Sequence, residues 1–295
     1  MVNGILLLDK PQGLTSNAAV QRVRRAFAKV KAGHTGSLDP LATGMLPVCL
    51  GEATKVAGFL LDGDKCYEFT ARFGARTATG DLEGPVVETA VVPADLEATL
   101  REVVPMFTGT IQQVPPMYSA LKRDGEPLYR LARQGIEVER APRTVQIREL
   151  ELLGVAENEA TLRVRCSKGT YVRTLAEDLA RRMGSCAHLV MLRRTAVLPF
   201  DGHALVTLAA VEANPTAIPL LAPDAALLHL PAANLPEEMA RRFAQGQIVG
   251  PPESLPGGLA RVYRGVGVFL GIGEGDGEGR LKPVRLFNDL DAHCA

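Results

Sequence analysis

The sequence has few cysteines, and no two of them are spaced to share a metal ion. Five cysteines are scattered along the 295 residues without a C-x-x-C pair: Cys49, Cys66, Cys166, Cys186 and Cys294. An odd number at wide spacing gives no sign of a disulfide framework, and half of a zinc site would need a C-x-x-C pair. We therefore expect reduced, mostly buried thiols.

Long hydrophobic runs are also missing. The longest apolar runs are far shorter than the roughly 20 residues that a membrane-spanning helix needs. The N-terminal residues Met1-Val2-Asn3-Gly4 lack the basic region and cleavage site of a signal peptide. We expect a cytoplasmic protein that has no membrane partner. With 295 residues, 46% of them hydrophobic and 22% charged, the chain can bury one sizeable core and still form a second, smaller unit.

The chain has no excess of charge of either sign, because 33 lysines and arginines balance 33 acids. Taken alone, this balance argues against nucleic-acid binding. The local distribution is uneven, however. Residues 10–31 hold six basic residues and no acid, and a second basic stretch lies between 163 and 194. For the arginines at positions 22, 24 and 25, a solvated helix face and contact with phosphates both remain open.

Several familiar catalytic motifs are absent. The sequence has no G-x-x-x-x-G-K-[ST], no G-x-G-x-x-G after its first predicted strand, no G-x-S-x-G elbow and no H-E-x-x-H. Thr35-Gly36 lacks the preceding aspartate of an aspartic protease, and no second such loop could complete a carboxylate dyad. A single activated aspartate remains as the chemistry that the motifs permit.

That aspartate lies in a loop predicted over residues 33–47. Three glycines and two prolines in these fifteen residues break any helical or strand period. Asp39, at the centre, is the first acid after Asp9, and six basic residues lie between the two. A carboxylate can act as a nucleophile or a general base, and a neighbouring arginine would keep it ionised. The arrangement suits a polyanion held around one reactive carboxylate.

The remaining pattern predicts interleaved strands and helices without a regular βαβ order. Helices are expected from an N-cap at Ser16 to Val30, over 51–62, 95–104 and 128–133, and between the glycine turn at Gly169 and the glycine stop at Gly184. Residues from Val206 to about 228 suggest a helix plus a connecting segment. Strands are expected over 4–10, 45–50, 65–73, 143–154 and 160–167. The tail from about 230 differs, with short strands at 261–263, 267–273 and 284–287 separated by glycine turns, as in a small β-barrel or sandwich.

Two further positions have a structural and a functional interpretation. Tyr67 begins a strand whose one face carries Tyr67, Phe69, Ala71 and Phe73, and from this pattern alone an edge core aromatic is favoured. Arg173 lies where a strand and a glycine turn lead into an amphipathic helix, a place from which functional groups often project. An arginine there could pair with a carboxylate, although a surface arginine is the commoner explanation.

The sequence also resembles a known family. Residues 33–44, Gly-His-Thr-Gly-Ser-Leu-Asp-Pro-Leu-Ala-Thr-Gly, closely resemble the signature loop of the TruB family of tRNA pseudouridine synthases. Other blocks resemble that family in the same order and cover about residues 1–200: they are 3–11, 51–55, 117–122, 166–174 and 192–194. The tail resembles, more weakly, the small RNA-binding domain of PUA type that ends bacterial members.

The resemblance implies a fold and an activity. We expect an α/β (α+β) catalytic domain over 1–228, built on a mixed, mostly antiparallel sheet, and a PUA-like β-barrel domain over 229–295. The expected reaction converts the uridine at position 55 of tRNA, in the T loop, to pseudouridine. The family mechanism needs neither a metal nor a cofactor. The T arm of tRNA is the expected partner, no protein partner is implied, and a monomer is expected.

The resemblance also assigns roles to residues. Asp39 would be the nucleophile, Tyr67 would stack against the target base, and Arg173 would pair with Asp39, orient it and depress its pKa. Residues of the base pocket would be Tyr171 and Leu192, with His34 filling the space of the extruded nucleotide. The RNA backbone would be contacted by Lys10, Arg22, Arg24, Arg25 and Lys55. Whether Asp39 attacks the ribose C1′ or the base C6, or first removes a 2′ proton, stays open.

Two other classes of protein compete with this interpretation. A non-catalytic RNA-binding or tRNA-folding protein would keep the basic residues and aromatics but could dispense with Asp39. The presence of Asp39 together with Tyr67 and Arg173 disfavours it. A hydrolase with a covalent aspartate, of the aspartyl-phosphate type, generally needs a metal-binding acid two residues further on, where this chain has Leu41.

Overall fold

A long mixed sheet forms the centre of the computed structural model, which describes residues 2–250, 255–265 and 267–287. Its strands follow the order β13-β1-β3-β12-β4-β11-β10-β7, and β2 pairs with β3. Only the pairs β1–β13 and β3–β12 are parallel. The strands are β1 (Gly4–Lys10), β2 (Ala32–His34), β3 (Thr43–Leu50), β4 (Lys65–Phe73), β7 (Gly109–Gln113), β10 (Arg143–Ala156), β11 (Glu159–Cys166), β12 (Ala187–Val197) and β13 (Val206–Thr207). The expected mixed, mostly antiparallel sheet is confirmed.

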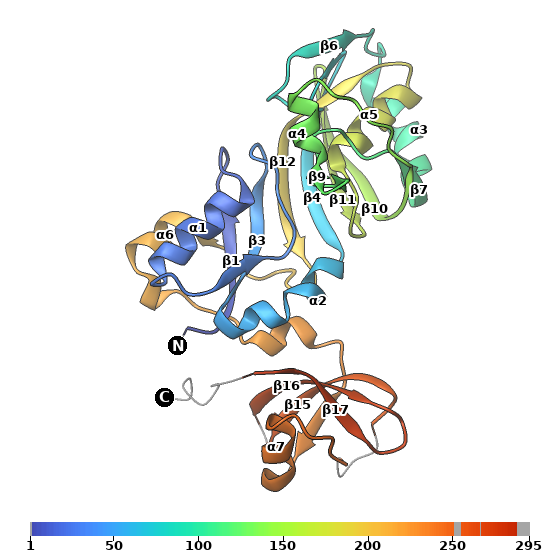
Figure 1. Cartoon of the computed structure of the whole chain (residues 1–295). Coiled ribbons are helices and arrows are strands. Elements are labelled where there is room, and N and C mark those ends of the chain that lie inside the picture. Colours follow the sequence, from blue (N-terminus) through green and yellow to red (C-terminus); the bar gives the residue numbers. More distant parts are fainter. Residues whose placement is uncertain (1, 251–254, 266, 288–295) are drawn as a thin grey trace.

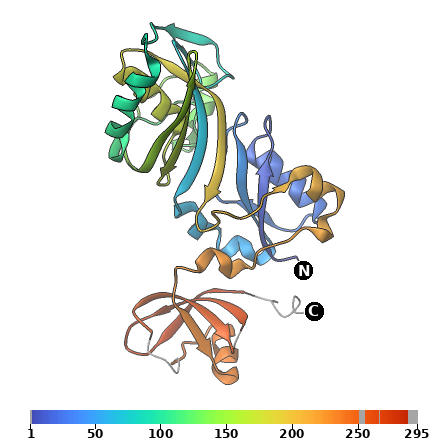
Figure 2. The same cartoon turned by 180° about the vertical axis from the view of Figure 1, so that it is seen from behind.

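Helices cover the two ends of this sheet. Figure 1 shows α1 and α6 together beside β1 and β3, and α3 and α5 near β7 and β10; Figure 2 shows β4 and β12 side by side from behind. The helices are α1 (Ser16–Ala26), α2 (Ala57–Asp62), α3 (Leu96–Val103), α4 (Leu128–Arg133), α5 (Val172–Arg182) and α6 (Leu208–Ala213), with short 3₁₀ turns at Gly51–Lys55, Val104–Phe107, Pro215–Ala217 and Pro223–Leu227. Small two-stranded ribbons add β5 (Ala75–Thr77) with β6 (Val86–Thr89), and β8 (Lys122–Arg123) with β9 (Glu126–Pro127).

Strand β4 shows why the sequence forms the sheet. Its alternating pattern buries Phe69, Ala71 and Phe73 on one face and leaves Arg72 exposed on the other. Tyr67 lies on the same face as the buried residues, with β11 and β12 hydrogen-bonded on either side of the strand. The predicted strand and its inward face are therefore confirmed.

Two local predictions are wrong. Thr15, not Ser16, caps α1, because the Thr15 side chain accepts a hydrogen bond from the backbone N–H of Ala18, whereas Ser16 is buried inside the helix. The predicted loop over 33–47 is shorter than expected, because β2 and β3 take its two ends. Gly44 belongs to β3 at φ +97°, and an added Cβ would lie 2.2 Å from the carbonyl oxygen of Arg194. This glycine permits the close approach of β3 to β12.

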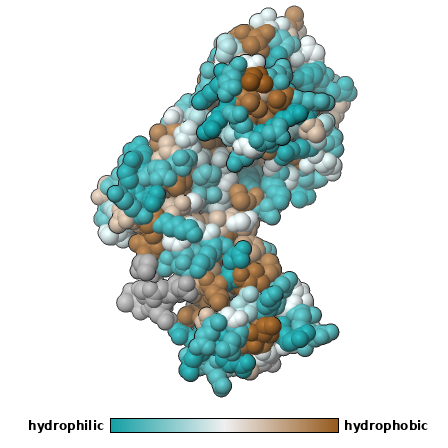
Figure 3. Space-filling model, in the orientation of Figure 1, coloured by the Kyte–Doolittle hydropathy of each residue, from teal (hydrophilic) through white to brown (hydrophobic). Residues whose placement is uncertain are grey.

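The C-terminal part forms its own four-stranded sheet, in the order β14-β15-β16-β17. The three predicted strands are present, while the first strand and the helix were not predicted: β14 (Ala232–Leu235), α7 (Glu237–Ala244), β15 (Gly258–Arg264), β16 (Val268–Gly275) and β17 (Leu281–Leu286). Phe269 and Phe287, with ring centroids 4.9 Å apart, share one buried cluster with Leu60 and Phe200. Figure 3 shows hydrophobic side chains where this sheet meets the rest of the chain.

The cysteines agree with the expectation as far as the structure describes them. Cys49, Cys166 and Cys186 are buried, Cys66 is half-buried, and all four are free thiols, while Cys294 lies outside the described residues. In the described ranges, no helix is long and apolar enough to cross a membrane.

Candidate functional site

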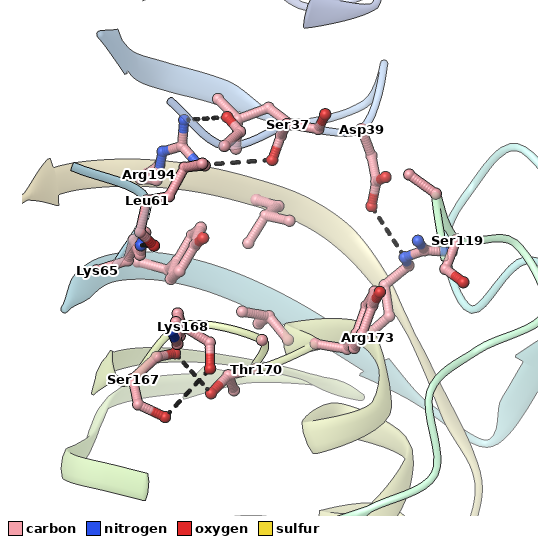
Figure 4. A pocket seen from close by; sticks show the side chains of 18 residues that line it. Ser37, Asp39, Leu61, Lys65, Ser119, Ser167, Lys168, Thr170, Arg173 and Arg194 are labelled. Carbon is pink, nitrogen blue, oxygen red and sulfur yellow. Dashed lines mark hydrogen bonds and ion pairs between the residues drawn. The ribbon is translucent and has the colours of Figure 1, made fainter. Parts of the chain in front are cut away.

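A pocket of about 340 Å³ gathers side chains from distant parts of the chain. Its walls come from the loop 35–42, from β4 and β12, from the turn between β11 and α5, and from residues 119–120. Five of the predicted residues line this pocket: Asp39, Tyr67, Tyr171, Arg173 and Leu192. Figure 4 shows Asp39 and Arg173 facing each other on one side of it. The volume suits a single small planar ligand.

Asp39 is the one acid among the pocket residues, and its loop is held from α1. The buried hydroxyl of Ser16 accepts a hydrogen bond from the backbone N–H of Leu38 at 2.7 Å and lies 3.1 Å from the Leu38 carbonyl, to which it can donate. The residue before Asp39 is thereby fixed to the first turn of a helix. Ser16 therefore sets the position of the loop that carries Asp39, a role that its predicted place as an N-cap did not suggest.

Arg173 aims its guanidinium at Asp39 with little freedom. Its side chain is 5% exposed, and Nε lies 3.0 Å from Oδ2 of Asp39. Nη1 donates to the carbonyl of Thr79 and Nη2 to that of Tyr118, both at 2.7 Å. The helix that carries Arg173 begins after a turn at Gly169, whose φ is +81°. The two carbonyls fix the plane of the guanidinium, and Nε is the group that faces the carboxylate.

Two opposing effects set the pKa of Asp39. Burial by the pocket walls raises the pKa of this carboxyl, and the Arg173 guanidinium lowers it, as predicted, but only in part offsets the rise. The net shift is therefore upward, which the sequence did not predict, because desolvation outweighs the ion pair. The side chain of Asp39 is still 40% exposed, so the carboxylate can be reached from the pocket.

The two tyrosines of the pocket are neutral near pH 7. Burial raises the pKa of Tyr67, with the Arg194 guanidinium opposing, and burial is also the main cause of the raised pKa of Tyr171. The backbone of Tyr171 is clamped by Gln113 of β7, which accepts from its N–H at 3.0 Å and donates to its carbonyl at 3.3 Å. The buried Gln113 was not predicted as part of the site.

Arg194 and Lys65 also line the pocket, although neither was predicted as a site residue. Arg194 is 1% exposed, and its guanidinium donates to the carbonyls of Met45 at 2.7 Å, Gly36 at 3.1 Å and Ser37 at 3.5 Å. Burial is the main cause that lowers the pKa of Lys65, to about 8. The sequence could have indicated Arg194 as a pocket residue, because side chains two positions apart in a strand lie on the same face and Leu192 was predicted to line the pocket.

His34 lies at the end of β2 and does not line the pocket. Its Nδ1 is buried, and no partner for it exists among the described residues. Burial, and secondarily Arg194, lowers the pKa of His34, so the imidazole is neutral at pH 7.

The residues predicted to contact the RNA backbone differ in their exposure and in their partners. Lys10 is wrong as a phosphate contact, because its side chain is fully buried and its ammonium donates to the carbonyls of Pro11 and Leu14 at 2.9 and 2.6 Å. Arg22 is paired with Glu212 at 2.6 Å. Lys55 pairs with Glu52 and donates to the carbonyl of Leu286 at 2.7 Å. Arg24 and Arg25 are exposed on α1, so their side chains can reach a ligand from solvent.

Comparison with known proteins agrees with this fold and pocket. Residues 24–172 match the TruB family pseudouridylate synthase N-terminal domain, residues 173–218 the tRNA pseudouridylate synthase B C-terminal domain, and residues 231–287 the C-terminal domain of pseudouridine synthase II TruB. The chain is 55% identical to the tRNA pseudouridine synthase B of Aromatoleum aromaticum, over 98% of this chain and 94% of that one. The protein of the same name from Stutzerimonas stutzeri is 52% identical, over 97% and 95%.

Solved structures give the same fold. A Cbf5-Nop10-Gar1 complex superposes with a TM-score of 0.70 at 24% identity, covering 96% of this chain and 83% of that one. An archaeal box H/ACA sRNP Nop10-Cbf5 complex reaches 0.72 at 24% identity, covering 98% and 87%. The fold and the sequence matches together define a pseudouridine synthase. Within that class, the chain belongs to the TruB family.

Proposed function

We propose that this protein isomerises uridine to pseudouridine in tRNA, and that its target is position 55 in the T loop. The names of the most similar relatives support the tRNA substrate. The observation that carries the chemistry is the carboxylate of Asp39, the sole acid in a pocket whose other walls are apolar, hydroxylic or cationic. Its partner Arg173 is locked by two carbonyls and presents one N–H to it.

Asp39 acts as the nucleophile in this proposal. The N-glycosidic bond must break while the detached uracil stays bound and turns to present C5 to the sugar. A carboxylate held by a fixed arginine can attack the ribose C1′, attack the base C6 or remove a 2′ proton. In each case the ionised form is required, so the rate follows the fraction of Asp39 that is deprotonated.

The target base occupies the space between Asp39 and the sheet. Tyr67 stacks against the base, and Tyr171 and Leu192 close the pocket around it. A base within a folded T loop must first be extruded, at a cost of a few kcal/mol. We assign His34, beside the pocket, to the space that the extruded nucleotide leaves.

Of the cations predicted to contact the RNA backbone, Arg24 and Arg25 on α1 are the most exposed. Arg22 and Lys55, whose side chains are partly exposed beside their acid partners, stay in the proposed set. Contacts of this kind make the affinity fall with rising salt.

We divide the chain into a catalytic domain over 1–228 and an RNA-binding domain of PUA type over 229–295. The separate sheet of the tail and a second buried cluster confined to residues 233–281 support this division, while Phe269 and Phe287 pack against the catalytic domain.

Tritium release tests the proposal directly. A tRNA carrying 5-tritiated uridine loses its label when C5 bonds to the sugar, and cleavage of the product maps the position. We expect release from position 55 with the intact protein and none with Asp39→Asn, which should still bind tRNA. Binding without release from either protein would favour an RNA-folding protein, and release that survives in Asp39→Asn would exclude Asp39 as the nucleophile.

A further inference from the structure

Two buried cations stand on the pocket wall opposite Asp39. Figure 4 shows Arg194 and Lys65 together on one side and the Asp39–Arg173 pair on the other. Arg194 on β12 pairs in register with Tyr67, two residues along β4 from Lys65, so the three side chains share one face of the sheet. The side chains of Arg194 and Lys65 are 1% and 6% exposed.

Backbone carbonyls, and no carboxylate, hold both cations. Arg194 donates to three carbonyls, and Lys65 donates to those of Leu61 at 2.6 Å and Gly63 at 2.5 Å. Among the described residues neither forms an ion pair with an acid. The nearest acids to Lys65 are engaged elsewhere, because Asp62 pairs with Lys168 at 2.7 Å and Asp64 with Arg148 at 3.2 Å. Burying a cation without a counter-charge is costly.

The donors of these two groups are not exhausted by the carbonyls. The guanidinium of Arg194 carries five N–H groups and makes three of the hydrogen bonds just described, and the ammonium of Lys65 carries three N–H groups and makes two. Arg173 also makes three such contacts, but it differs because one of its partners is a carboxylate, that of Asp39. The pocket therefore has one wall that presents an oriented carboxylate and another that presents positive charge without a negative partner.

The reaction produces negative charge on the base by either route of attack. When the C1′–N1 bond breaks, its electron pair goes to N1, and the charge spreads to O2 and O4. When a carboxylate instead adds to C6, the electrons of the C5–C6 double bond move toward O4. In the C6 route the C1′–N1 bond then breaks as well, with its electron pair going to N1. Afterwards C5 bonds to C1′, and the bond from Asp39 to C1′ or C6 breaks and returns its electron pair to the carboxylate. The C5 hydrogen leaves as a proton to water, and N1 takes a proton from water. The base is transiently anionic in both sequences.

We infer that Arg194 and Lys65 are the electrostatic partner of this charge and hold the uracil while it turns. The inference rests on the proposed function and deepens it. A fixed positive wall that needs no rearrangement stabilises charge as it develops, which is how preorganised donors accelerate reactions. The positive charges of Arg194 and Lys65 attract both O2 and O4 of the base, so they can hold the ring in more than one orientation.

The test compares uridine with 5-fluorouridine at the target position of the tRNA. Fluorine withdraws electrons and stabilises the anionic base by itself, so the reaction then depends less on the wall. Single-turnover loss of the N-glycoside is measured by digesting the tRNA and separating the nucleosides. For Lys65→Met we expect a rate about 100-fold lower on uridine, and a loss of about tenfold or less on 5-fluorouridine.

Conservative and control variants separate this role from a structural one. Lys65→Arg keeps the charge and should recover most of the rate on uridine. Arg194→Lys keeps the charge but loses the guanidinium that donates to three carbonyls. Part of the decrease in rate should therefore come from the disturbed structure and be equal on uridine and 5-fluorouridine. Lys168→Met removes a 62% exposed cation that also lines the pocket, and its effect should be the same on both substrates.

Equal losses on both substrates for a folded Lys65→Met, checked by circular dichroism, would overturn the inference, as would an undiminished rate on uridine. If Lys65→Met does not fold, Lys65→Gln replaces it and is judged by the same comparison. The proposed function fails separately, because then the intact protein converts neither tRNA.

Discussion

Replacing Arg173 by methionine should shift the pH dependence of the reaction. The rate rises with pH as Asp39 ionises, and burial already raises the pKa of Asp39, with Arg173 opposing. An opposite charge at close range lowers a carboxyl pKa by about 1 to 3 units. The Asp39 side chain is 40% exposed, so solvent screens part of the attraction by Arg173, and removal of Arg173 raises the pKa further by less than it would for a fully buried pair.

The acidic limb of the pH–rate profile in single turnover should therefore move to higher pH in Arg173→Met. Tritium release measured between about pH 4.5 and 9 at saturating tRNA would show it. Arg173→Lys keeps the charge but cannot hydrogen-bond to Asp39, Thr79 and Tyr118 at the same time. The acidic limb of its pH–rate profile should therefore stay close to that of the intact protein, while the maximal rate falls. Arg72→Met, which removes the exposed partner of Glu159, is the control. A limb that stays in place or moves to lower pH in Arg173→Met would refute the reasoning.

Two further predictions concern the catalytic loop and the tail. Ser16→Ala leaves the buried N–H of Leu38 without its acceptor, so urea unfolding should show that the free energy of unfolding falls by about 1 to 3 kcal/mol. The reaction rate should also fall while tRNA binding persists. The control Thr15→Ala removes only the helix cap and should lower the free energy of unfolding by about 1 kcal/mol without changing the rate. A chain ending at residue 228 should bind tRNA more weakly in filter-binding assays but retain some turnover, and complete loss of turnover by a folded truncation would contradict the assignment of the tail.

The sequence was informative where local pattern decides structure. The alternation of residues 67 to 73 placed Tyr67 on the inward face of a strand, and the strand-turn-helix pattern placed Arg173 at the start of a helix. The prediction that Asp39 and Arg173 meet came from the family resemblance. Local pattern does not bring together residues so far apart in the chain.

Charge patterning predicted partners least well. Lys10 was counted with the exposed basic residues, but its strand buries it against carbonyls. Arg22 is neutralised by Glu212, 190 residues away, and no local pattern reveals such a pair. The sign of the Asp39 pKa shift was missed for a related reason, since the sequence shows the neighbouring cation but not the loss of water.

The anchors of the catalytic loop come from three separate elements. Ser16 on α1 holds Leu38, Arg194 on β12 holds the carbonyls before it, and Arg173 on α5 holds Asp39 itself. A loop fixed at consecutive residues from three directions cannot swing far toward a base that remains stacked in RNA. In the proposed mechanism the uridine must therefore move to the carboxylate, so extrusion of the nucleotide is expected from the anchoring of the loop as well as from the burial of the pocket.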